Sequence, residues 1–208
     1  MSGNDRTEER KADDHGKREK DLHDLLSWWA SAQLEHQTAV DILSHGLWGG
    51  VAFGRRSRRS FWLAFVLSLA PDLLSFGILW AAVILGVAKK PDFSHGTPPE
   101  ATIPEYVHAL YNVTHSFLVF LLVFFVVWVL HRRPMWELAA WGLHLLVDVP
   151  THSYAFFPTP IFWPFFNWKF DGWQWMNPAI LIPNYALLAF VYTWLSRPWF
   201  EPQEASPT

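Results

Sequence analysis

Three polar side chains, His144, Asp148 and His152, follow one another at intervals of four residues at the end of an apolar run. On a helix the first two lie one above the other on the same face. The third comes just past Pro150, where a helix is expected to stop or bend. Imidazole and carboxylate groups at that spacing are ligands for a divalent metal. Because such groups are costly in a membrane-grade apolar segment, the pattern predicts a functional site.

Three other stretches contribute side chains of the same kinds. They are the pair Asp41 and His45, again four residues apart, Asp72 after Pro71, and His115 between Thr114 and Ser116. Together with the first group they supply three carboxylates and four imidazoles, enough for two divalent ions or for one ion whose ligands have hydrogen-bonding partners of their own. The chain has no cysteine, so any metal must be held by histidine and carboxylate.

Each of these residues also has a purely structural explanation. Asp72 could cap a helix, His115 could be a hydrogen-bonded interfacial histidine, and the pair His144 and Asp148 could stabilise a helix bundle. An unpaired carboxylate deep in an apolar run costs several kcal/mol, however, and the run around Asp72 holds no lysine or arginine. Some cation is therefore expected beside it. A proton relay remains open too, because chains of His and Asp in membranes also carry protons.

Composition separates the two ends of the chain from the rest. Hydrophobic residues make up 51% of the 208 residues, with 14 Trp and 17 Phe. Residues 1–24 alternate acids and bases and are expected to form a disordered charged tail, and residues 201–208 a flexible C-terminal tail. Residues 25–200 are expected to form a helical membrane domain that holds the metal site. A net charge of -3 without a basic groove gives no reason to expect nucleic acid.

Apolar runs indicate an integral membrane protein. Four segments are long and apolar enough to lie in a bilayer: 61–88, 113–130, 135–149 and 178–195. The first would span roughly 40 Å as one helix, more than a hydrocarbon core of about 30 Å, and Pro71 interrupts it. Residues 25–54 resemble an interfacial helix followed by a short one dipping into the membrane. The predicted fold is an all-α polytopic helical membrane protein with about four to five membrane helices, one broken at Pro71.

Basic clusters and connecting segments complete the topology. The clusters lie at 55–59, at 132–133 and at 197, which alternating spans place on one side, the cytoplasmic one. Lys89 and Lys90 are an exception. Segment 89–112 is expected to be a solvated loop. Segment 154–176 is almost half aromatic, and it is interpreted either as an interfacial belt or as a wall over the polar site.

Several of these motifs resemble a known family. HGLWGGVAFG, APDLLSFG, YNVTHSFLVFL and HLLVDVPTHSYAFFPTPIFWPF occur in the order found in the inner-membrane metal-dependent hydrolases of prokaryotes, one branch of which is described as LexA-binding. The resemblance covers roughly residues 40–170. It implies that the ligand positions of the family fall on His45, Asp72, His115, His144 and Asp148. Leu74 departs from the commoner pattern by replacing a second acid, and Leu110, Tyr111 and Asn112 replace His-Arg-Gly.

The expected function is hydrolysis by a metal-dependent enzyme in a prokaryotic inner membrane. One or two divalent ions, with zinc expected, would activate water against a lipid or lipid-linked ester or phosphoester. Membrane lipids are the expected partners. The expected metal ligands are His45, Asp72, His115, His144, Asp148, His152 and Asp41, and the expected catalytic residues are His152 and Asp148. A transporter of metal ions or protons that uses the same residues, and a non-catalytic scaffold whose charged head binds a partner, are the alternatives.

Overall fold

The computed structural model describes residues 20, 42–92, 97–175 and 177–195. The helices in chain order are Ile42–Phe53, α2 (Arg58–Asp72), α3 (Ile78–Ile84), α4 (Glu105–Thr114), α5 (Phe117–His131), α6 (Ala139–Thr151) and α7 (Pro178–Leu195). Single 3-10 turns occur at Glu100–Thr102 and Trp136–Leu138. In the described residues the β structure is limited to one isolated bridge between Ser153 and Phe156. The prediction of an all-α fold is confirmed.

The helices α2 and α3 form one helical run, Arg58–Ile84, which passes through a π-helical turn at Leu73–Gly77. The run begins at Ser57, whose hydroxyl accepts a hydrogen bond from the Ser60 N–H. Pro71 has no N–H to donate and crowds the turn before it, and the wider π turn follows directly. The hydroxyl of Ser75 donates to the C=O of Pro71. The sequence predicted that the helix is broken at Pro71. The structure shows instead that the helix continues through this π turn.

Two helical segments are long and apolar enough to cross a membrane, Arg58–Ile84 and Pro178–Leu195. The helices α4 and α5, bent by 56° at their junction, make a third if they count as one span. The 13 residues of α6 rise only about 20 Å, less than the bilayer core of about 30 Å. Two to three candidate spans thus support membrane association. The predicted number of four to five membrane helices is not reached among the described helices when length is the criterion.

The surface of α5 indicates the kind of environment it occupies. Among its residues, all of which the structure describes, Phe120 alone is buried. Leu122, Phe125 and Leu130 are 62%, 59% and 73% exposed. A helix that is apolar all round and largely uncovered is typical of contact with lipid.

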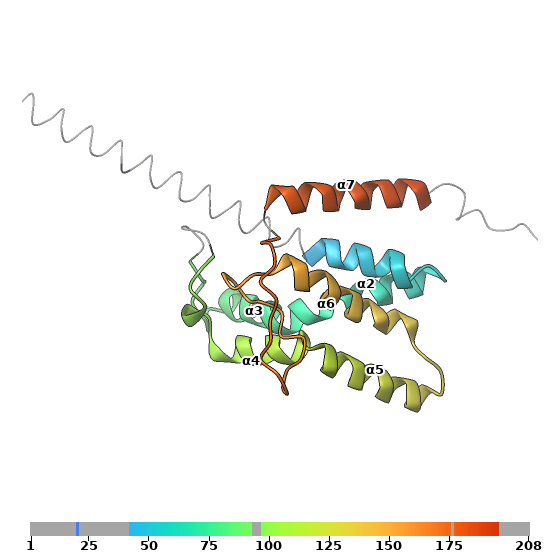
Figure 1. Ribbon diagram of the computed structural model, residues 1–208, viewed down its shortest axis with the longest axis horizontal. Coiled ribbons are helices and arrows are strands. Elements are labelled where there is room, and N and C mark those ends of the chain that lie inside the picture. The colour runs from blue at the N-terminus through green and yellow to red at the C-terminus, as the bar shows by residue number, and fades with distance from the viewer. Residues whose placement is uncertain (1–19, 21–41, 93–96, 176, 196–208) are drawn as a thin grey trace, which may run out of the picture.

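Small residues bring three helices together at the centre of the fold. A Cβ at Gly49 would lie 2.5 Å from the Ser68 Cβ and 3.0 Å from the Ala140 Cβ. The Ser68 hydroxyl, which is buried, also lies 2.7 Å from the C=O of His45 and 3.3 Å from that of Ala140. In Figure 1 helix Ile42–Phe53 lies beside α6 and α2. These contacts limit the distances between the polar residues that lie one turn away on the three helices, namely His45, Asp72 and His144.

The segment before α5 differs from the predicted loop. The helix α4 begins at Glu105, and its residues Val107 and Tyr111, four apart, both face a core that includes Leu79 and Phe157. Apolar residues at this spacing form one face of a helix. The prediction of a solvated loop over 89–112 is therefore wrong for residues 105–112. These residues form a helix whose apolar face packs against α3 and against the aromatic segment that follows α6.

The helix α7 lies along helix Ile42–Phe53 on the outside of the molecule (Figure 1). Trp48 Nε1 donates to Asn184 Oδ1 at 2.8 Å, and the Tyr192 hydroxyl donates to the C=O of Leu47 at 2.9 Å. Only 6% of the apolar stretch of α7 is buried. A helix attached so lightly leaves most of its apolar surface for lipid.

Candidate metal centre

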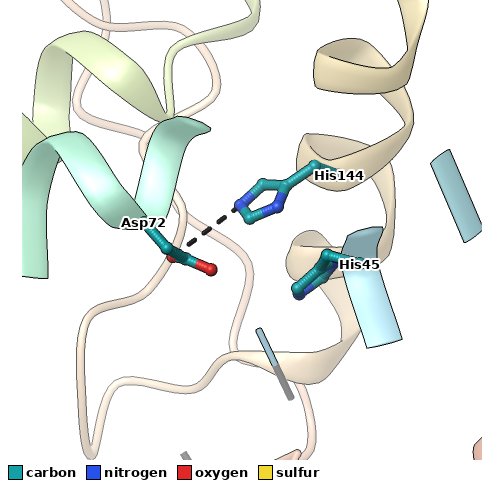
Figure 2. Close-up of side chains that lie close together, drawn as sticks. All are labelled: His45, Asp72 and His144. Carbon is teal, nitrogen blue, oxygen red and sulfur yellow. Dashed lines mark ion pairs between the residues drawn. The ribbon is translucent and has the colours of Figure 1, made fainter. Parts of the chain in front are cut away.

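Side chains from four separate parts of the chain meet in the interior. His45 comes from the short first helix, Asp72 from the end of α2, His115 from the junction of α4 and α5, and His144 and Asp148 from α6. Figure 2 shows His45, Asp72 and His144 with their side chains turned toward one another. His152 follows the last residue of α6. Asp41, the remaining predicted ligand, lies outside the described residues.

His115, His144 and Asp148 each offer a ligand atom within 4.8 Å of the other two, and His45, Asp72 and His144 do the same, so His144 belongs to both groups. His144 Nε2 is 3.2 Å from His115 Nε2 and 3.0 Å from Asp148 Oδ2. His115 Nε2 is 3.4 Å from both Asp72 Oδ1 and Asp148 Oδ2, and the distance from His144 Nε2 to Asp72 Oδ1 is 3.9 Å. Zinc bonds of about 2.0 Å place tetrahedral ligands about 3.3 Å apart. The five distances scatter around that value.

The tautomer of His115 strengthens this interpretation. The Thr114 hydroxyl donates its single hydrogen to the C=O of Leu110 at 2.9 Å. Its oxygen, 3.0 Å from His115 Nδ1, therefore accepts from an N–H there. In the neutral ring Nε2 then carries a lone pair, and that lone pair faces two carboxylates and another imidazole. Acceptor groups facing one another need a cation between them, either a metal ion or protons on the histidines.

The carboxylate of Asp148 faces two groups of histidines. Its Oδ2 is directed at His115 and His144, while its Oδ1 lies 3.1 Å from His45 Nε2 and 3.7 Å from His152 Nδ1. Within the described part of the chain, no donor approaches either oxygen with the alignment of a hydrogen bond. A carboxylate that is surrounded by ring nitrogens but not hydrogen-bonded to them fits a bridging or chelating ligand.

Burial differs between the members of this cluster. The side chains of His45, His115, His144 and Asp148 are at most 2% exposed. Asp72 and His152 are 15% and 13% exposed, so these two lie where the cluster reaches the surface. Placing two carboxylates beside each other in such an interior is unfavourable unless positive charge accompanies them. The residues present fit one divalent ion, and the second face of Asp148 leaves room in the ligand set for another.

The segment after α6 holds the cluster in place. The Ser116 hydroxyl donates to the C=O of Trp163, and the Phe117 N–H donates to the C=O of Ile161. These two hydrogen bonds hold the junction between α4 and α5, where His115 lies. Gly172 donates its N–H to the C=O of His152 at 2.8 Å. Phe157 is buried, whereas many other aromatic residues of the segment are exposed. The segment thus acts as a wall on one side and presents an aromatic surface on the other.

Sequence reasoning missed two residues that shape the site. The Tyr111 ring stacks on the His115 ring, with centroids 3.8 Å apart and an interplanar angle of 16°. Its hydroxyl donates to the C=O of Phe157 at 2.7 Å, which ties α4 to the wall. Thr114 orients His115 through the contact of its hydroxyl with His115 Nδ1. The four-residue interval from Tyr111 to His115 was the available signal, since it places both on one helical face.

Comparison of the chain with protein families, with curated proteins and with solved structures found no match. The function must therefore be argued from the site itself. The geometry establishes a buried cluster of histidine and aspartate that could hold a metal ion, in a helical protein with two to three candidate membrane spans.

Proposed function

We propose that the protein is a membrane-embedded, metal-dependent hydrolase. The observation that carries the proposal is the convergence of histidine and aspartate in two largely buried groups of three, His115 with His144 and Asp148, and His45 with Asp72 and His144, whose ligand atoms lie within 4.8 Å of one another in each group. His45 would complete the ligand set on the other face of Asp148. Zinc is the expected ion because imidazole with carboxylate suits it.

The chemistry would divide between the ion and the residues at the opening. A divalent ion in such a site supplies Lewis-acid polarisation and activates water for attack. His152 is placed to move a proton, because its ring lies at the surface of the cluster while its Nδ1 points toward Asp148. Asp148 would both hold the ion and orient His152. Asp72, the other partly exposed member, would border the substrate.

The surroundings favour a lipid or lipid-linked ester or phosphoester as substrate. The wall beside the cluster exposes Tyr154, Trp168 and Trp173, and tyrosine and tryptophan are enriched at the membrane interface. We place the protein in a prokaryotic inner membrane, with the arginines before α2 on the cytoplasmic side. In that setting α6 and Ile42–Phe53 would lie within the bilayer and bring the membrane helices to four or five. The motif resemblance to inner-membrane metal-dependent hydrolases agrees with this placement.

A second candidate function is transport of protons or metal ions. Buried polar side chains continue from the cluster toward the far end of α2: Ser68 contacts the C=O of His45, and Ser60 donates to Glu137 at 2.6 Å. Such a series could form part of a pathway. Ala64, which is fully buried, lies between Ser60 and Ser68 along α2, so the polar series is interrupted by an apolar turn.

Elemental analysis of detergent-purified protein tests the metal site. Wild type should contain one or two zinc or other divalent ions per chain, and Asp148→Asn and His144→Gln should lose them. The matched control is His131→Gln, which alters the same residue type at the end of α5, away from the cluster, and should keep the metal. Equal metal in the Asp148 and His144 variants and in wild type would show that the cluster is not the binding site.

Catalysis is tested on the same preparations. Wild type should release fatty acid or headgroup from phospholipid vesicles, chelation should stop the release, and added zinc should restore it. Metal-loaded protein that hydrolyses neither phospholipids nor nitrophenyl ester and phosphoester probes would contradict the hydrolase. If the same protein in liposomes then carried metal or protons across the bilayer, transport would replace it.

A further inference from the structure

A second site lies at the other end of α2, away from the histidine cluster. A cavity of about 700 Å³ opens between helix Ile42–Phe53, the start of α2 and the end of α7. Arg58 and Asp72 mark the two ends of the 15-residue α2, which separates the two sites by roughly 20 Å. Nothing in the metal-dependent chemistry proposed above uses this cavity.

The lining of the cavity is apolar inside and basic at its mouth. Val51, Phe61, Trp62 and Leu195 contribute the apolar wall. Arg55, Arg56 and Arg58 line the mouth, and all three are exposed. Arg56 contacts Glu137 at 3.2 Å, so part of its charge is compensated. Arg55 and Arg58 add two further guanidinium groups to the same lining.

A smaller hollow adjoins the first. Its volume is about 360 Å³, and it lies against Phe190, Val191 and Trp194 of α7. Both hollows share Val51, Arg55 and Leu195. Arg55 thus stands at the head of two apolar spaces that lie side by side. An anionic group bonded to this arginine could extend one apolar chain into each space.

We propose that this groove binds a two-chain anionic phospholipid. Guanidinium groups pair with phosphate through two parallel hydrogen bonds, and anionic lipids are enriched on the cytoplasmic leaflet where basic clusters lie. The acyl chains fill the hollows beside α7, a helix with 6% of its apolar stretch buried and two hydrogen bonds to helix Ile42–Phe53. The lipid thereby joins α7 to the rest of the fold.

Thermal unfolding and native mass spectrometry of the full-length protein in detergent test the proposal. Phosphatidylglycerol should raise the melting temperature and stay bound in the mass spectrum, and phosphatidylcholine at the same concentration should do neither. The double variant Arg55→Gln/Arg58→Gln should bind phosphatidylglycerol about thirtyfold more weakly, since each arginine contributes to attraction of the headgroup. The matched control Arg132→Gln/Arg133→Gln removes two charges at the end of α5 and should bind as wild type does.

A second variant and a second ligand keep the result decisive. Leu195→Trp fills the shared wall without changing charge and should also lose phosphatidylglycerol, with helical content and bound metal unchanged. Glycerol phosphate should give no shift, and a shift equal to that of the lipid would show a site for a soluble phosphate instead. Equal binding of the two lipids, equal losses in both double variants, or full binding by Leu195→Trp would each overturn the proposal. A chelator should leave the lipid shift intact, which separates this site from the metal centre.

Discussion

Gly49 packs so closely against Ser68 that a Cβ at position 49 would lie 2.5 Å from the Ser68 Cβ. Each of the two residues stands four positions from a member of the cluster, Gly49 from His45 and Ser68 from Asp72. The contact therefore lies one helical turn from the ligands on both helices. The separation of His45 from α2 is set by how closely these two backbones approach.

Gly49→Ala should weaken metal binding although it changes no ligand. The added methyl group must push helix Ile42–Phe53 away from α2, and overpacking of this kind costs about 1–3 kcal/mol. Metal titration and thermal unfolding measure both effects. Gly77→Ala is the control, because its Cβ would meet Leu73 at an ordinary 3.5 Å. Equal metal affinity in the two variants would show that this contact does not position His45.

Thr114→Val should lower metal affinity by about 10–100-fold, as loss of a partner of a ligating histidine does. The valine removes the oxygen that holds His115 Nδ1 at 3.0 Å, so the ring no longer has one favoured tautomer and orientation. Thr114→Ser keeps the hydroxyl and should keep most of the affinity. Competition with a chromogenic chelator measures the three dissociation constants. An unaltered affinity in Thr114→Val would count against the tautomer argument.

Gly172→Ala should detach the aromatic segment from the end of α6. A Cβ there would lie 2.4 Å from the Pro150 carbonyl oxygen and 2.6 Å from that of His152, and backbone atoms cannot give way as a flexible side chain can. We expect a lower melting temperature and slower hydrolysis with metal still bound, since His152 moves and His144 does not. Metal content, melting and turnover are measured on one preparation. Loss of the metal together with turnover would place the damage in the ligand set instead.

Ser60→Ala should destabilise the protein in a pH-dependent way. The Ser60 hydroxyl donates to Glu137 in the turn between α5 and α6, and this hydrogen bond holds the pKa of Glu137 below its usual value of 4.5. A lowered pKa in the folded state stabilises the protein above pH 4.5, and this contribution disappears as the pH falls through the folded-state pKa. A hydrogen bond to a charged group contributes about 1.5–3 kcal/mol.

Melting curves across a pH series check this expectation. The difference between wild type and Ser60→Ala should be constant near neutral pH and shrink in acid. Thr193→Ala is the control, because the Thr193 hydroxyl donates to the uncharged C=O of Ala189 at 2.8 Å. The decrease in melting temperature caused by removing this hydroxyl should not depend on pH. A Ser60→Ala difference that stays the same in acid would show that ionisation of Glu137 is not involved.

The members of the cluster could be chosen from the sequence because polar groups in apolar runs are energetically costly and therefore stand out. The i to i+4 spacing of His144 and Asp148 also gave a correct local geometry, since both lie on one helix. Which atoms face one another could not be predicted, because His45, Asp72 and His115 come from helices whose relative placement depends on packing. A usable signal was present in the small residues Gly49, Ser68 and Ala140, each four positions from a ligand.

Irregular backbone was harder to predict than the choice of residues. Pro71 correctly marked an irregular point, but a proline does not specify whether the helix ends or widens. The π turn follows Pro71, and Ser75 donates its hydroxyl to the Pro71 carbonyl within it. The helix α4 was missed because its apolar face is short and interrupted by polar residues. Its buried face packs on a core that includes Leu79 and Phe157, the latter 46 residues beyond Tyr111.

The cluster draws its members from distant points along the chain, and this order affects how the protein is made. A chain synthesised from its N-terminus completes the apolar helix Arg58–Ile84, with Asp72 inside it, before His115 and His144 exist. A lone aspartate near the middle of a membrane helix opposes insertion by about 2.5–3.5 kcal/mol. That opposition falls when the junction of α4 and α5 brings His115 to within 3.4 Å of Asp72, and again when α6 brings His144 to 3.9 Å. In the proposed membrane placement, biogenesis therefore has a late step in which the first long helix reaches its final depth as His115 and His144 come into place beside Asp72.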